Sequence, residues 1–128
     1  MAGTVVCNTL NTDTGLFSTN NAYSGIAQAW VNFNGNSGAS PVIRQSFNVS
    51  SVTRNGTGDY TVTFANAFVD INYTALVSGN YNLTGGNNIS FVAPFNQAPT
   101  TTTIRIQTTA CATGTVLDQT YVTLVAFR

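Results

Sequence analysis

Few residues in this 128-residue chain carry groups that could transfer a proton or hold a metal ion. It has four aspartates, four arginines, two cysteines and five tyrosines, and no histidine, lysine or glutamate. General acid–base catalysis uses side chains whose pKa can be tuned towards neutrality, most often histidine, and zinc sites need clusters of histidine and cysteine. We therefore expect no catalytic residue, no metal site and no cofactor, and we do not expect an enzyme.

The aspartates are too few and too widely spread to form a calcium site, which takes several oxygen ligands from adjacent residues. They stand at Asp13, Asp59, Asp70 and Asp118. Asp59 and Asp70 lie beside expected turns, so we expect each carboxylate to accept hydrogen bonds from backbone amides.

The two cysteines, Cys7 and Cys111, allow one disulfide bond or none. Met1 to Thr4 shows neither the basic start nor the apolar stretch of a signal peptide, which favours free thiols in a reducing compartment. The two thiols are then expected to be small buried apolar groups, and a bridge between them is the alternative.

The overall composition restricts the class of partner. Charged residues make up 6% of the chain and the net charge is zero, so no basic face exists to bind a nucleic acid or an anionic membrane. Apolar residues make up 43%, enough to fold, and no apolar run approaches the ~20 residues that span a bilayer. Near-zero net charge favours association, so the sequence indicates a subunit of an assembly, without membrane insertion.

Apolar and polar residues alternate with a period of two along most of the chain, and threonine (21 residues) and asparagine (16 residues) are abundant. Residues 1–24 are expected to hold a short strand (3–9) and an irregular arm (11–24), and residues 25–128 a single domain. The fold class expected is all-β: an antiparallel β-sandwich of about eight strands without substantial helix. The expected strands are 3–9, 26–34, 42–52, 59–64, 71–77, 88–92, 100–109 and 120–127.

The alternation also predicts which side chains face the core. Residues 42–64 are expected to form a hairpin with a loop over 54–58, where Asn55-Gly56 supplies the positive φ angles of a tight turn. Ile43, Gln45, Phe47 and Val49 are expected to share one face. Ile71 is expected to share the inward face of the next strand, and residues 93–99, with two prolines, to form a loop. Ile104 and Ile106 are expected to point inward and Arg105 outward.

Two strands are apolar on both faces, which is typical of strands covered by the core on one side and by another body on the other. This pattern makes Trp30, Val125 and Phe127 candidate residues of a subunit interface, and Phe95, between two prolines, a further candidate. For Trp30 the alternative is stacking against a sugar ring.

The segment 80–88 combines one tyrosine with four asparagines and two glycines, a mixture seen in recognition loops. Tyr81, Asn82 and Asn87 are therefore candidate receptor-contacting residues. The alternative is an ordinary polar loop.

Three stretches resemble a module of tailed-bacteriophage virion proteins of marine phages and cyanophages, usually described as tail fibre or fibre-like structural proteins. They read AWVNFNG (29–35), IRQSFNVSSV (43–52) and NGTGDYTVTF (55–64), and the likeness extends more weakly over nearly the whole chain. The resemblance implies a virion appendage, homotrimeric, whose C-terminal part projects towards the host. It implies no catalytic residue.

The expected function is thus a self-assembling structural subunit of a phage virion, made in the host cytoplasm. Its expected partners are copies of itself, other tail or capsid proteins, and a glycan on the host surface. We expect a trimer that uses the faces around Trp30 and the C-terminal strand. The alternatives are a capsid decoration or head fibre protein, favoured by the absence of a long shaft from the sequence, and a stand-alone carbohydrate-binding module.

Overall fold

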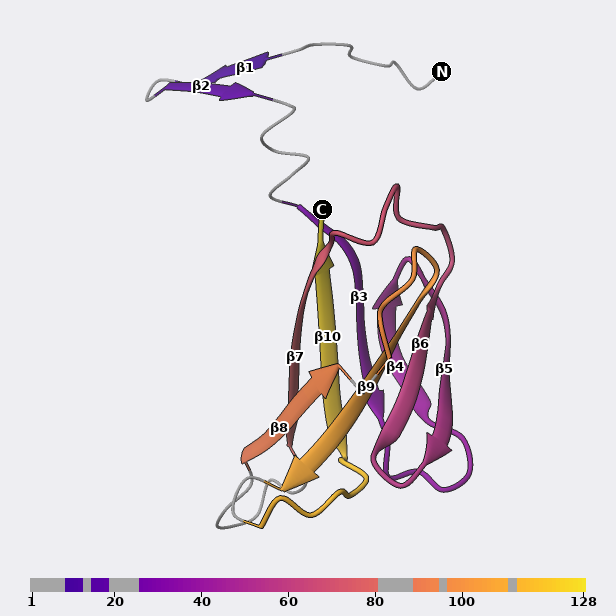
Figure 1. Cartoon of the computed structure of the whole chain (residues 1–128). Helices are drawn as coiled ribbons and strands as arrows, with labels where there is room; N and C mark the ends of the chain where they lie inside the picture. The colour runs from indigo at the N-terminus through magenta and orange to yellow at the C-terminus, as the bar shows by residue number, and fades with distance from the viewer. Residues whose placement is uncertain (1–8, 13–14, 19–25, 81–88, 95–96, 111–112) are drawn as a thin grey trace.

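The computed structural model of the chain describes residues 9–12, 15–18, 26–80, 89–94, 97–110 and 113–128 (Figure 1). These residues form β-strands joined by turns and loops, with no helix among them. It follows that none of the described segments is an apolar helix of membrane-spanning length.

The N-terminal part contains a β-hairpin. Strands β1 (Thr9–Thr12) and β2 (Gly15–Ser18) pair antiparallel and form a two-stranded sheet of their own. The prediction of an irregular arm over 11–24 was therefore wrong at these positions, because the threonines that suggested a loop also favour strands. The expected strand 3–9 lies outside the described residues except for Thr9.

The other eight strands form an antiparallel β-sandwich, as the sequence predicted (Figure 1). One layer has the order β4-β3-β10-β7 and the other the order β5-β6-β9-β8, and the two layers are joined where the ends of β7 and β8 pair. The strands are β3 (Ala27–Asn34), β4 (Val42–Phe47), β5 (Val49–Gly56), β6 (Asp59–Phe64), β7 (Thr74–Asn80), β8 (Ile89–Pro94), β9 (Thr103–Ala110) and β10 (Tyr121–Phe127).

The core lies between the two layers and is built from alternate residues of the central strands. Two aromatic groups anchor it: Phe33 packs edge-on against Tyr60, and Phe64 packs with Phe68 and Tyr73. Burying a large apolar side chain contributes about 1.5–3 kcal/mol, so these positions dominate the stability of the domain. The buried apolar residues are Ala29, Val31, Phe33, Tyr60, Val62, Phe64, Phe68, Tyr73, Ile104, Ile106, Val122, Leu124 and Ala126.

The inward positions predicted for Ile104 and Ile106 are confirmed, and Arg105 lies on the outer face. The prediction for Ile71 was wrong, because this side chain is 54% exposed. Strand β7 begins only at Thr74, so the alternation of its inward face does not extend back to Ile71.

The expected strand 42–52 is in fact two strands in different layers. Strand β4 pairs with β3, whereas β5 pairs with β6, and the chain crosses between the layers at Asn48. Asn48 has a φ of 53°, a left-handed conformation that asparagine tolerates better than most residues. Its side-chain amide donates to the carbonyl oxygen of Gln28 (3.0 Å), which fixes the crossing against β3.

Phe47 does not face the core. In the register of β3 with β4, Asn32 lies opposite Gln45 and Phe33 opposite Ile43, so Arg44 is an extra residue in a β-bulge. The bulge shifts the alternation by one position, and Phe47 lies on the outer face with 55% of its surface exposed. The prediction that Phe47 shares a face with Ile43 was therefore wrong, since Ile43 packs against the core.

The hairpin of β5 and β6 is confirmed, and its turn lies within the predicted loop 54–58 but is shorter than that loop. Asn55 and Gly56 belong to β5, and the turn residues are Thr57 and Gly58. Gly58 has a φ of 61°, and a Cβ atom there would lie 2.7 Å from the carbonyl oxygen of Thr108. Both the backbone angle and this close approach require glycine.

A second boundary also differs from expectation. Strand β8 continues to Pro94, which lies opposite Ile106 of β9, although 93–99 was predicted to be a loop. Proline is compatible with this position because β7 pairs with β8 only at Ile89 and Ser90, so that Pro94 lies on a part of β8 paired on one side.

The order of strands begins with β4 and ends with β5, and both of these edge strands are irregular. Strand β4 carries the bulge at Arg44, and β5 shifts register near both of its ends. Regular hydrogen-bonding edges are thus interrupted on both strands.

Candidate subunit interface

Four apolar side chains form a straight row across the outer face of the layer β4-β3-β10-β7. In the strand register Phe47 lies opposite Trp30, Trp30 opposite Val125, and Val125 opposite Leu76. Residues directly opposite each other in antiparallel strands point to the same face of the sheet. We refer to these four residues as the apolar row.

The apolar row is separate from the core. The neighbouring residues Ala29, Val31 and Leu124, which point to the other face of the same strands, are fully buried. At the ends of the row, Phe47 and Leu76 are 55% and 61% exposed, while Trp30 and Val125 between them are partly buried. Large apolar side chains left exposed in a contiguous set are typical of a surface that binds another molecule.

Polar residues bound the apolar row on one side along the strands, and Phe127 lies on the other side. On one side the next row consists of Gln45, Asn32, Thr123 and Ser78, and the Asn32 amide donates to Thr123 Oγ1 (3.0 Å). On the other side Phe127 lies opposite Thr74. The apolar surface therefore ends at the polar row on one side and continues to Phe127 on the other.

Arg44 is the charged residue of β4, and its guanidinium group is engaged away from the apolar row. It donates to Asn32 Oδ1 (3.2 Å) and to the carbonyl oxygen of Thr120 (2.8 Å), and it lies 4.1 Å from the ring centre of Tyr121. These contacts hold the cation beyond the polar row, so it places no charge among the apolar side chains.

A groove of about 490 Å³ adjoins the Phe47 end of the apolar row. Its walls are mainly apolar, and its polar members are already engaged, because Asn48 Nδ2 donates to Gln28 O and Asn48 Oδ1 accepts from Asn66 N (2.8 Å). No titratable side chain is among its described lining residues, so the groove suits an apolar side chain better than a reacting group. The lining residues are Ile26, Ala27, Gln28, Phe47, Asn48, Ala65, Asn66 and Ala67.

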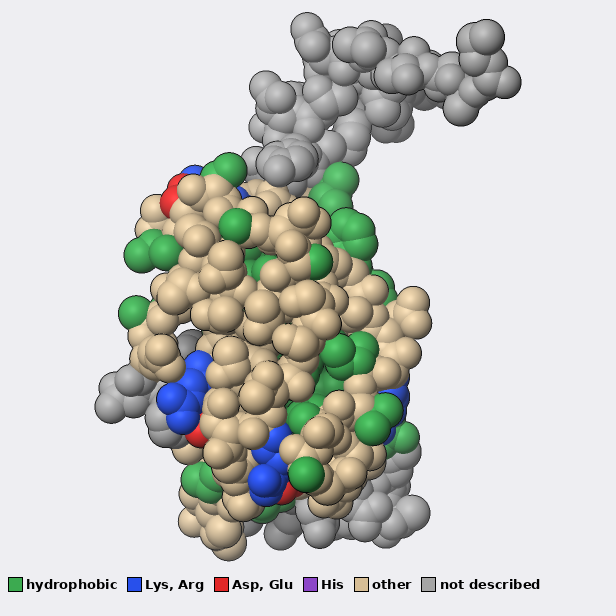
Figure 2. Space-filling view, turned by 90° about the vertical axis from the view of Figure 1, so that its right-hand side faces the viewer, with side chains coloured by type: hydrophobic (Ala, Val, Ile, Leu, Met, Phe, Trp, Pro, Cys, Tyr) green, Lys and Arg blue, Asp and Glu red, His purple; other side chains and the backbone are tan. Residues whose placement is uncertain are grey.

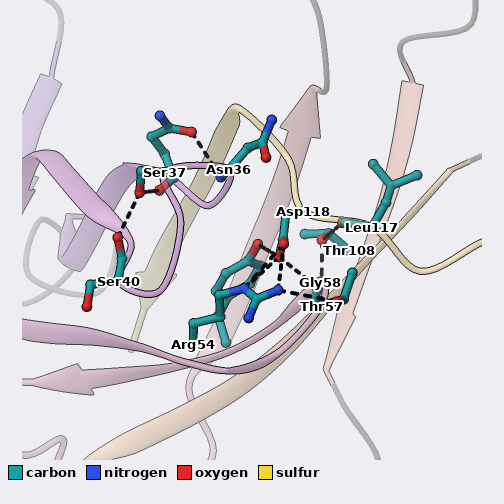
Figure 3. Close-up of polar contacts among 11 residues, drawn as sticks. Asn36, Ser37, Ser40, Arg54, Thr57, Gly58, Thr108, Leu117 and Asp118 are labelled. Atoms are coloured by element: carbon teal, nitrogen blue, oxygen red, sulfur yellow. Dashed lines mark hydrogen bonds and ion pairs between the residues drawn. The ribbon is translucent and has the colours of Figure 1, made fainter.

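The charged groups gather elsewhere and form structural pairs. Arg54 and Asp118 form a two-pronged pair, with Nη2 to Oδ2 at 2.8 Å, and the Gly58 amide donates to Asp118 Oδ1 (2.8 Å) (Figure 3). The buried Tyr60 hydroxyl donates to the same oxygen at 2.5 Å. This cluster fastens the loop before β10 to the β5–β6 hairpin.

The pKa values of the Asp118 carboxyl and the Tyr60 hydroxyl in this cluster are both shifted away from neutral pH. Burial works to raise the pKa of Asp118, but the hydrogen bonds from Arg54, Tyr60 and Gly58 outweigh it, and the pKa lies below its ordinary value. Burial and the bond to Asp118 raise the pKa of Tyr60. Neither group is suited to exchange protons near pH 7, so we interpret the cluster as structural. We refer to Arg54, Gly58, Tyr60 and Asp118 as the clamp.

The prediction for the other aspartates was half right. Asp70 Oδ1 accepts from the Asn72 backbone amide (2.8 Å), as expected, and the carboxylate also pairs with Arg128. Asp59 instead pairs with the Arg105 side chain at 2.6 Å, which lowers its pKa. An arginine on the neighbouring strand, two residues out of register, gives Asp59 a stronger partner than a turn amide.

The surface on the β5–β6 side is largely uncharged and polar (Figure 2), and Arg54, Arg105 and Arg128 each pair with an aspartate. Hydroxyl groups account for much of it, because Ser51 lies opposite Thr63 and Thr53 opposite Thr61 on the outer face of this layer. The two layers thus present different chemistry to the outside: hydroxyl groups on one, an apolar row on the other.

Of the interface residues predicted from the sequence, Trp30 and Val125 lie in the apolar row and Phe127 lies beside it. Phe95, the loop residues Tyr81, Asn82 and Asn87, and the cysteines Cys7 and Cys111 lie outside the described residues. Phe47 and Leu76 were missed. Leu76 could have been found, since it is the apolar member of an outward set with Thr74 and Ser78, whereas the bulge that exposes Phe47 leaves no sign in the alternation.

Within the part of the chain that the structure describes, no three histidine, cysteine, aspartate or glutamate side chains gather where they could hold a metal ion. Comparison with family models, with curated proteins and with solved structures gives no match.

Proposed function

We propose that the chain is a structural subunit of a bacteriophage virion, a tail fibre or fibre-like appendage that assembles with copies of itself. The observation that carries the self-assembly is the apolar row, which leaves Phe47 and Leu76 more than half exposed on a sandwich that already has a complete core. The resemblance of residues 29–64 to phage virion modules supports the proposal that this assembly is part of a virion.

The chemistry of the whole surface supports this proposal. With a net charge of zero, copies do not repel one another, and apolar burial does not weaken as salt rises. The hydroxyl-rich outer face of the β5-β6-β9 layer remains free to meet solvent or a host surface glycan. No described cluster offers the proton chemistry of an enzyme.

The first test measures the oligomeric state at low concentration by analytical ultracentrifugation. We expect a trimer for the wild type and dissociation for Trp30→Ala and for Leu76→Thr. Leu76 is 61% exposed, so Leu76→Thr removes an apolar contact without opening the core. Ser78→Ala, in the adjacent polar row, is the matched control and should stay assembled. A wild type that is monomeric at micromolar concentration would refute self-assembly.

The second test places the chain in the particle. Quantitative mass spectrometry of purified virions, with the major capsid protein as internal standard, gives its copy number. We expect a number far below that of the capsid protein, as for a tail appendage. A number comparable with it would replace the tail by a capsid decoration protein, and its absence from virions would favour the stand-alone carbohydrate-binding module.

A further inference from the structure

We propose that residues 4–8 of a neighbouring copy form a strand on the open edge of β7, antiparallel to it. The added strand is the segment that directly precedes the β1–β2 hairpin. This inference rests on the proposed self-assembly and adds to it the means by which one copy holds the next.

Strand β7 has a regular edge that is open over most of its length. Among the described residues, β8 pairs with β7 only at Gly79 and Asn80 and then follows β9, so residues 74–78 are paired on the β10 side alone (Figure 1). The register of β7 with β10 runs without a shift, unlike the pairings of the edge strands β4 and β5. Every second residue of such an edge points its N–H and C=O groups away from the sheet, where a further strand can bind.

The core is less well covered along β7 than beneath the neighbouring strand β10. Ala75 and Val77 pack against the core but are only partly buried, whereas the residues opposite them on β10, Ala126 and Leu124, are fully buried. On the outer face, Leu76 is 61% exposed at the end of the apolar row. The open edge therefore favours a strand with apolar side chains on both of its faces.

Residues 4–8 match this edge position by position. Residues 74–78 read Thr-Ala-Leu-Val-Ser and residues 4–8 read Thr-Val-Val-Cys-Asn, so each segment has three apolar residues between two polar ones. Neither segment contains a charge, and Val6 opposite Leu76 lengthens the apolar row by one strand. The pairs in the antiparallel register are Thr4 with Ser78, Val5 with Val77, Val6 with Leu76, Cys7 with Ala75 and Asn8 with Thr74.

The position of the β1–β2 hairpin favours a neighbouring copy over the chain's own β7. The hairpin lies beyond the end of the sandwich at which β3 begins, so a strand that leads into β1 starts outside its own domain (Figure 1). Thr74 lies at this same end, because Ala27 and Thr74 are both paired with Phe127. The antiparallel register places Asn8 at Thr74, so the copies stand side by side with their hairpins at one end. A two-stranded hairpin is marginally stable alone, and this pairing would anchor it.

The test uses chains with one cysteine each, in which the other native cysteines are replaced by serine. A chain that keeps only Cys7 is co-expressed with a size-tagged chain that carries only Ala75→Cys, oxidised mildly and analysed on a non-reducing gel. The second pair is Val6→Cys with Leu76→Cys. A disulfide requires Cβ atoms about 3.5–4.5 Å apart, and successive opposite pairs alternate between wider and closer spacing, so we expect the mixed product from at least one pair. Cys7 with Leu76→Cys, one position out of register, is the matched control and should give far less of that product.

The possible failures of this test are distinguishable. Absence of the mixed product from both pairs, in a protein that ultracentrifugation shows to be assembled, overturns the strand exchange, and so does equal cross-linking of the out-of-register pair. When Cys7 and Ala75→Cys are placed in one chain, a disulfide within that chain would mean that residues 4–8 return to their own sheet, which also overturns the exchange. A wild type that is monomeric refutes the proposed self-assembly itself.

Discussion

Replacing Tyr60 with phenylalanine removes one hydroxyl from the clamp around Asp118. The hydroxyl is fully buried and donates to Asp118 Oδ1 at 2.5 Å. A hydrogen bond to a charged group contributes about 1.5–3 kcal/mol, and Asp118 keeps its bonds from Arg54 and Gly58, so we expect a loss of about 2 kcal/mol. For a sandwich of this size, that lowers Tm by roughly 10 °C in calorimetry at fixed protein concentration.

Tyr73→Phe is the matched control for this change. The Tyr73 side chain is also buried, but its hydroxyl donates to a neutral acceptor, the carbonyl oxygen of Thr100, at 3.1 Å. A neutral bond contributes about 0.5–1.5 kcal/mol, so the loss should be clearly smaller. If Tyr60→Phe lowered Tm no more than Tyr73→Phe does, the clamp would not have the strength that its geometry indicates.

Three further predictions concern stability. Folding lowers the pKa values of Asp59, Asp70 and Asp118, so their contribution to stability is complete above about pH 4 and is lost as the pH falls through the lowered pKa values. Because the chain has no histidine or glutamate, we expect Tm to stay constant between about pH 5 and 7. A change of Tm within that range would contradict this assignment. Gly58→Ala should lower the free energy of unfolding, measured with denaturant, by about 3 kcal/mol, because it combines a positive φ with a clash against the carbonyl oxygen of Thr108. Gly38 also has a positive φ but open space around it, so Gly38→Ala should lower the free energy of unfolding by less. Asn48→Gly relieves the left-handed backbone but removes the side-chain bonds to Gln28 and Asn66, so unfolding should become easier by about 1 kcal/mol, and a stabilised variant would show that those bonds contribute little.

The layered fold and much of its core were predictable because they follow from alternation. Val31, Phe33, Val122 and Leu124 occupy the buried positions that a period of two assigns to them. The sequence also singled out Trp30 and Val125, since an apolar residue on the second face of a strand is visible in the same pattern.

What escaped prediction are the places where the chain departs from that period. One extra residue at Arg44 turned Phe47 outward, and one left-handed residue, Asn48, moved the chain into the other layer. Both depend on contacts with the preceding strand β3, and the alternation within 42–52 gives no sign of these contacts. The partner of Asp59 also depended on a non-local contact, because Arg105 reaches it from β9.

The irregular edges of β4 and β5 bear on whether the sheets of neighbouring molecules can join. Most proteins are kept apart by net charge, and an uncharged sandwich with regular edges would extend its sheets from molecule to molecule into fibrils. The bulge at Arg44 and the register shifts of β5 interrupt the row of backbone donors and acceptors that such growth needs. These irregularities therefore disfavour growth of the sheets from one molecule to the next.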